Sequence, residues 1–182
     1  VIDAWGGFRF APAAGYRPLI GFSNGDGLNL DPPPANYNWL PTWADPTDKV
    51  TWDCWISGIH RQHTGGHLRT LIIGDDDYTN RHIVLDQPVS TYLLFIASSD
   101  YHELVQRDSL PRISHYVYPT RETQAVTHFS NVPAVLDGFV NLFGPYPFED
   151  FGFMMTRQGD MEHATCVSHL DQLVIANNSY DW

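Results

Sequence analysis

Residues 143–156 read FGPYPFEDFGFMMT. Gly144 and Pro145 end any helix that reaches them, because proline cannot continue a helix and glycine is the usual residue just past its end. The apolar run at residues 151–156 then predicts a strand. A helix that ends at this turn, followed by a strand, indicates that the second part of the chain has α/β structure.

Upstream of this turn, apolar residues recur at helical spacing over residues 121–143. Thr120 is a candidate N-cap for this helix. Because Pro133 lies inside the stretch, we expect either a kink or two helical pieces. Residues 113–118 alternate like a strand, and residues 170–175 fit a strand or a helix equally well.

The first part of the chain is rich in Gly, Pro, Asn and aromatic residues, which is typical of short strands joined by turns. Strands are predicted at residues 50–56 and 68–73. The strongest candidate is residues 90–97, whose nearly continuous apolar run predicts burial on both faces. The pattern favours an α+β fold, with a mostly-β domain over residues 1–112 and an α/β domain over residues 113–182.

The composition excludes several classes of partner. The formal net charge of the 182 residues is -11, and so acidic a chain repels phosphate backbones, so we expect no nucleic-acid partner. No apolar run approaches the roughly 20 residues that span a bilayer, so no membrane segment is expected. Cys54 and Cys166 lack the spacing of a disulfide framework or a metal site. We expect both to be small buried residues, and the sequence leaves open whether they pair.

Four motifs occur in the order and at the separations found in one family of enzymes. Residues 39–51 read WLPTWADPTDKVT, residues 87–93 read QPVSTYL, residues 143–152 read FGPYPFEDFG and residues 159–163 read GDMEH. Together they resemble the M1 family of gluzincin zinc aminopeptidases, where the stretches read W-F-P-x-x-D-x-P-x-x-K-A-T, P-I-x-T-Y-L, F-G-P-Y-P-F-x-x-Y-G and G-x-M-E-N. The resemblance covers most of the chain and is poor over residues 52–67.

The resemblance implies that residues 1–112 belong to a β-rich N-terminal domain and that residues 113–182 begin a thermolysin-like catalytic domain. It also implies a Zn²⁺ ion held by H-E-x-x-H and a distant Glu. This sequence contains no such motif, since His102 is the only histidine followed by Glu and the second His is missing. We therefore expect a fragment that stops before the zinc-binding helix, binds no zinc itself and is inactive alone.

The motif GDMEH would bind a peptide substrate with a free N-terminus. Glu162 would hold the α-ammonium group of the substrate through a charge-assisted hydrogen bond, which restricts cleavage to the terminal residue. Gly159 would allow close backbone approach, while Asp160 and Met161 would complete the segment, Met161 as packing or pocket wall. His163 replaces the usual Asn and would add a titration near neutral pH. Without the family, Glu162 reads as an ordinary surface residue.

Other interpretations remain open. His60, His63 and His67 could bind Zn²⁺ or Ni²⁺ weakly, although Gly65 and Gly66 favour a solvated loop there. The rival to a peptidase is a non-catalytic binding or scaffold module, or a pseudo-enzyme derived from the M1 fold. A third interpretation keeps the fold and makes the enzyme an epoxide hydrolase or an endopeptidase.

Overall fold

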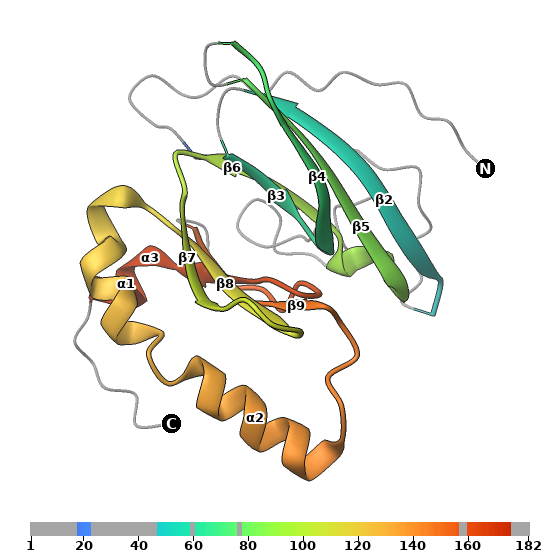
Figure 1. Cartoon of the computed structure of the whole chain (residues 1–182), viewed down its shortest axis with the longest axis vertical. Coiled ribbons are helices and arrows are strands. Elements are labelled where there is room, and N and C mark those ends of the chain that lie inside the picture. Colours follow the sequence, from blue (N-terminus) through green and yellow to red (C-terminus); the bar gives the residue numbers. More distant parts are fainter. Residues whose placement is uncertain (1–17, 23–46, 59–60, 76–77, 157–159, 176–182) are drawn as a thin grey trace.

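The computed structural model describes residues 18–22, 47–58, 61–75, 78–156 and 160–175. In this part of the chain the fold is mixed α+β, with strands in three sheets and a few short helices (Figure 1). This agrees with the predicted class. The assignment of the two parts to M1-type domains stays a prediction.

Two three-stranded antiparallel sheets come from the first half of the chain. One sheet has the order β2 (Lys49–Gly58), β5 (Thr79–Ser90), β4 (His67–Ile73). The other has the order β1 (Pro18–Phe22), β6 (Phe95–Ser99), β3 (Arg61–Thr64). The strands predicted at residues 50–56 and 68–73 are confirmed.

The single strand predicted over residues 90–97 is wrong in its middle. A 3-10 turn, η3 (Thr91–Leu93), separates β5 from β6 and is closed by a hydrogen bond from Leu94 N to Thr91 O of 3.2 Å. Leu94 and Phe95 are nevertheless fully buried, at 1% and 0% exposure. The apolar run therefore marks a buried corner where the chain passes from one sheet to the next.

The third sheet belongs mostly to the second half of the chain. Its order is β11 (Val167–Leu170), β10 (Phe153–Thr156), β8 (Arg112–Val117), β7 (His102–Arg107), with β9 (Asp150–Phe151) also paired to β8. β8, β10 and β11 are parallel, and β7 is antiparallel to β8. The strand predicted at residues 113–118 is confirmed. The strand predicted at residues 151–156 is found as β9 and β10, with a break at Gly152. β7 precedes and β8 follows the domain boundary predicted at residue 112, so the hydrogen bonds between these strands cross that position. The boundary itself stays a prediction.

The helical stretch predicted at residues 121–143 consists of two pieces, as Pro133 suggested. They are α1 (Glu122–His128) and α2 (Val132–Phe143), and Pro133 lies in the first turn of α2, where its missing N–H costs little. Thr120 does not cap α1, because it lies within the preceding 3-10 turn, η4 (Pro119–Arg121). α3 (Asp171–Ile175) decides the open choice after β11 in favour of a helix. No helix in the described residues is long and apolar enough to cross a membrane.

Two buried clusters hold the sheets together. The larger joins β6 to the third sheet, α1 and α3 through apolar side chains that include Phe95, Tyr116, Phe129, Met154 and Cys166. The smaller consists of Leu85, Val89, Leu94 and Ala164. The segment just before β11 contributes Ala164 to one cluster and Cys166 to the other, so it is packed against both halves of the chain.

Of the three histidines in the His-rich turn, His60 lies outside the described residues, and His63 and His67 are not in the solvated loop that the sequence favours. His63 lies in β3, is only 6% exposed, and stacks on Tyr116 with ring centroids 4.1 Å apart. Gly65 and Gly66 are buried, and Gly66 has a φ of 119°, where a Cβ atom would collide with the carbonyl oxygen of Val84. The glycine therefore serves close packing against β5.

The two cysteines are not paired with one another. Cys166 is buried, Cys54 is half-buried, and both thiols are free. Burial raises the pKa of the Cys54 thiol to about 12, and the nearby charge of Asp53 adds to the rise. A thiol with so high a pKa is protonated at neutral pH and is a poor nucleophile.

Candidate functional site

The segment that carries the predicted substrate-binding residues lies beside β11. Met161 and Ser168 form an antiparallel bridge, in which Met161 N donates to Ser168 O (3.2 Å) and Ser168 N donates to Met161 O (2.9 Å). Ser168 is also paired with Met154 of β10 on its other side. This single bridge holds Met161 against the edge of the third sheet.

Side chains alternate along this segment between the interior and solvent. Met161 is 9% exposed and His163 is 2% exposed, whereas Glu162 between them is exposed. His163 N also donates a hydrogen bond to Met161 O at 2.9 Å, so the chain makes a tight turn centred on Glu162. With both neighbours buried, the Glu162 side chain is the one that this turn leaves exposed. It is open to a ligand and is carried by fixed backbone.

His163 is part of the core. Its ring lies against Phe95 with centroids 4.6 Å apart. Burial lowers the pKa of His163 to about 4, and a backbone hydrogen bond with Leu93 opposes part of that effect. The predicted titration near neutral pH is therefore wrong, because the imidazole is neutral there and is shielded from solvent.

Asp160 is exposed and has defined partners. Its Oδ1 accepts a hydrogen bond from Leu170 N at 2.6 Å and lies 3.4 Å from His169 Nδ1. These contacts link the start of the segment to the end of β11. Gly159, the remaining residue of the predicted motif, lies outside the described residues.

A pair of histidines that no sequence pattern marks lies next to this segment. His128 is in the last turn of α1 and His169 is in β11, and their Nε2 atoms are 3.0 Å apart. Burial lowers the pKa of both imidazoles. For His169 the charge of Asp160 raises the pKa and a protonated His128 would lower it. The two histidines are 41 positions apart in the sequence, which explains why local motifs give no sign of them.

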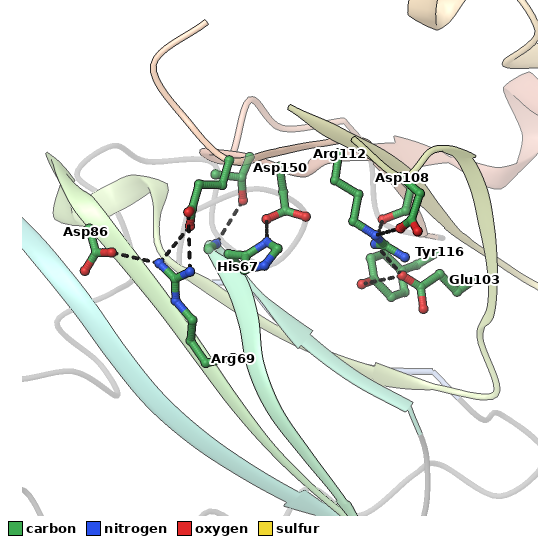
Figure 2. Close-up of polar contacts among 12 residues, drawn as sticks. His67, Arg69, Asp86, Glu103, Asp108, Arg112, Tyr116 and Asp150 are labelled. Carbon is green, nitrogen blue, oxygen red and sulfur yellow. Dashed lines mark hydrogen bonds and ion pairs between the residues drawn. The ribbon is translucent and has the colours of Figure 1, made fainter. Parts of the chain in front are cut away.

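The FGPYPFED motif has a structural function at the junction between β4 and the third sheet (Figure 2). His67 Nδ1 lies 2.5 Å from Asp150 Oδ2, and Arg69 Nη2 lies 2.7 Å from Glu149 Oε2 and 2.9 Å from Asp86 Oδ2. Burial raises the pKa of Asp150, and the attraction of His67 opposes the rise. The two acidic residues of the motif thus bind the first half of the chain to the second.

A second polar cluster lies on the β7–β8 hairpin. Arg112 Nη1 donates to Glu103 Oε1 at 2.8 Å and to Ser114 Oγ at 2.9 Å, and its Nε donates to Asp108 Oδ1 at 3.2 Å (Figure 2). Tyr116 Oη also reaches Glu103 at 3.5 Å. These contacts satisfy charges within the hairpin and point to a structural function.

The described residues form a partly open pocket of about 180 Å³ where β4 and β5 meet the FGPYPFED segment, lined by residues that include His67, Gln87, Phe148, Asp150 and Thr165. Ligand pockets usually measure about 300–1,000 Å³, so this one does not accommodate a peptide. Within the described part of the chain, no group of three or more His, Cys, Asp or Glu side chains converges as a metal site.

A scan against protein-family models found no match for this chain, and a search of curated proteins found none either.

Proposed function

We propose that this chain is part of a zinc metallo-aminopeptidase of the M1 type, in which Glu162 binds the α-ammonium group of a peptide substrate. The observation that carries the proposal is the exposure of Glu162 between two buried neighbours, on a segment fixed by the Met161–Ser168 bridge. The motifs at residues 39–51, 87–93, 143–152 and 159–163 support the same family. The zinc ligands and the general base would come from residues outside these 182.

Glu162 would hold the substrate N-terminus at a set distance from the reacting centre. A carboxylate that accepts hydrogen bonds from a substrate ammonium forms a charge-assisted contact, which is stronger than a neutral one. Because the neighbouring Met161 is bridged to β11, the backbone that carries this carboxylate is held in place. A substrate ammonium group bound there would leave only the first peptide bond within reach of the reacting centre. Zn²⁺, when bound, would polarise the scissile carbonyl group and lower the pKa of its water ligand.

The neighbouring residues would support this anchor from the interior. His163 is buried and neutral, and it packs on Phe95, so in the proposal it fixes the backbone on one side of Glu162. Met161 does the same on the other side through its bridge to Ser168. Substrate recognition at this point would therefore depend on the carboxylate and on main-chain groups.

The test is a kinetic comparison in the zinc-containing protein that includes this chain. Glu162→Gln keeps the size of the side chain and removes its charge, and we expect kcat/KM for peptides with a free N-terminus to fall by about 10- to 150-fold, the equivalent of one hydrogen bond to a charged group. Glu162→Asp should fall less. The matched control is Glu122→Gln, since Glu122 is an exposed carboxylate on α1.

Hydrolysis of N-acetylated peptides shows whether Glu162 acts through the ammonium group of the substrate. They lack the ammonium group, so Glu162→Gln should leave their slow hydrolysis unchanged. Equal losses on free and acetylated peptides would show that Glu162 does not recognise the N-terminus. Complete absence of peptidase activity in the zinc-loaded wild-type protein would favour the non-catalytic binding module.

A further inference from the structure

His128 and His169 meet nitrogen to nitrogen. Their Nε2 atoms are 3.0 Å apart, and their ring centroids are 5.1 Å apart with an angle of 32° between the planes. In the absence of another group, one Nε2 must carry a proton and donate it to the lone pair of the other. Without that proton, the lone pairs of both Nε2 atoms point into the space between the two rings.

This separation suits two ligands of one metal ion. Imidazole nitrogens bind Zn²⁺ at about 2.0–2.1 Å. With bonds of about 2.05 Å, two nitrogens 3.0 Å apart subtend roughly 94° at the ion. That angle is near the value for adjacent positions of a tetragonal site and below the tetrahedral value. A small outward shift of either ring would reach the tetrahedral value.

Asp160 lies close to the second ring nitrogen of His169. Its Oδ1 lies 3.4 Å from His169 Nδ1 and is itself fixed by Leu170 N at 2.6 Å. A carboxylate near Nδ1 favours the proton on that nitrogen and leaves Nε2 as the donor atom for a metal. Metal-bound histidines in proteins usually have such a partner on their second nitrogen.

Aromatic side chains pack against the histidine pair. Phe129 packs edge-on to both histidine rings, and Phe153 packs edge-on to His169. The His128 side chain is half-buried, which leaves a route for an ion to enter.

The nearby His115 is not a third ligand. Its Nδ1 accepts a hydrogen bond from Phe153 N at 3.1 Å, and its Nε2 donates to Gln106 Oε1 at 2.8 Å. Both ring nitrogens are thus engaged. Among the described residues the protein therefore offers two nitrogens, and water or an external ligand would complete the coordination.

We propose that His128 and His169 form a two-histidine site for one divalent first-row transition-metal ion, with Asp160 as the residue that orients His169. The angle between the two nitrogens favours Cu²⁺ and Ni²⁺ over Zn²⁺, in agreement with the general affinity order of these ions. The site is separate from the zinc site expected of a peptidase, and it does not depend on peptidase activity.

Calorimetric titration of the untagged chain with NiCl₂ and ZnCl₂ at pH 7.5 tests the site. We expect one ion per chain, with Ni²⁺ bound more tightly than Zn²⁺. His128→Gln and His169→Gln should each weaken metal binding at least tenfold. Asp160→Asn should weaken it by up to about tenfold, the lower end of the loss seen when a residue that contacts a metal ligand is replaced. His102→Gln is the control and should change the affinity less than twofold, because His102 is exposed and pairs with Glu122.

A measurement on the wild-type chain tests the site without any substitution that could impair folding. Nitrogen-15 spectra of the histidine rings should show the Nε2 signals of His128 and His169 moving together on addition of ZnCl₂, while the signals of His102 stay in place. If those two signals do not move, or if both Gln variants bind as tightly as wild type while keeping the wild-type melting temperature, the pair is only a hydrogen bond and the proposal is overturned.

Discussion

Gly152, between β9 and β10, lies directly against the backbone of Ser114 in β8. A Cβ atom at this position would collide with the carbonyl oxygen of Ser114. Backbone atoms cannot move aside as the end of a flexible side chain can. We therefore expect Gly152→Ala to destabilise the protein by about 2–4 kcal/mol, in the range for overpacking together with a backbone shift.

Gly138 provides the matched control for this prediction. It lies inside α2, and an added Cβ would meet nothing within 4 Å. Gly138→Ala should stabilise the protein by about 0.5–1 kcal/mol, because alanine loses less backbone freedom in a helix. Urea unfolding of both variants measures the two effects. Equal effects of the two substitutions would contradict the close approach at Gly152.

Two buried histidines predict a loss of stability in acid. Burial lowers the pKa of His115 to about 3 and that of His163 to about 4, from an ordinary 6.5. The unfolded chain therefore takes up protons below about pH 6.5 that the folded chain takes up only near pH 3 to 4, so the free energy of unfolding falls as the pH falls through this window. At pH 5 each histidine should cost about 2 kcal/mol relative to pH 7.5.

His163→Phe isolates one of these contributions, since phenylalanine keeps a ring against Phe95 and cannot be protonated. The loss of unfolding free energy between pH 7.5 and pH 5.0 should be smaller in this variant than in wild type by about 2 kcal/mol. Urea midpoints at the two pH values give the comparison. An identical pH dependence in both proteins would mean that His163 is protonated as easily in the folded state as in the unfolded state.

At the scale of elements, α2 presents an apolar face to solvent. Phe139, Leu142 and Phe143 are 56%, 77% and 79% exposed, and Leu136 is the buried residue of this helix. Arg107 Nη2 anchors α2 to β7 through Asp137 Oδ2 at 2.6 Å. Such a face promotes association between molecules.

The double substitution Phe139→Glu, Leu142→Glu should reduce self-association and leave the melting temperature nearly unchanged, because both side chains are exposed in the folded state. Leu136→Ala should instead cost about 2–5 kcal/mol, as it removes a buried side chain. Sedimentation velocity over a range of concentrations and thermal melts give the two readouts. A wild-type chain that stays monomeric at high concentration would contradict the expected association.

At the scale of the whole molecule, local patterns predicted most elements, and contacts distant in sequence decided the exceptions. Pro133 correctly split a helical stretch, because its effect is local. The apolar run at residues 90–97 was misleading, because burial at a corner between sheets and burial in a central strand give the same pattern. His63 was expected in a solvated loop, and only its packing on Tyr116 shows that it is buried.

The candidate sites, too, have features that the sequence predicts and features that only the structure shows. Glu162 could be named from its motif, and the sequence could not show that its neighbours on both sides are buried. His128 and His169 belong to no motif, and it is the packing of α1 against the third sheet that brings them together. The acidic pair Glu149–Asp150 was part of a recognised motif, while its contacts with Arg69 and His67 required the structure.

The most direct test of the aminopeptidase proposal is the coding sequence on the C-terminal side of residue 182. The proposal predicts H-E-x-x-H there, in a helical pattern and in the same reading frame, followed by a further Glu, since this set binds zinc and supplies the general base. A continuous reading frame without that set, or a stop codon in its place, would contradict the proposal. Glu162 would then be an exposed carboxylate without a catalytic partner.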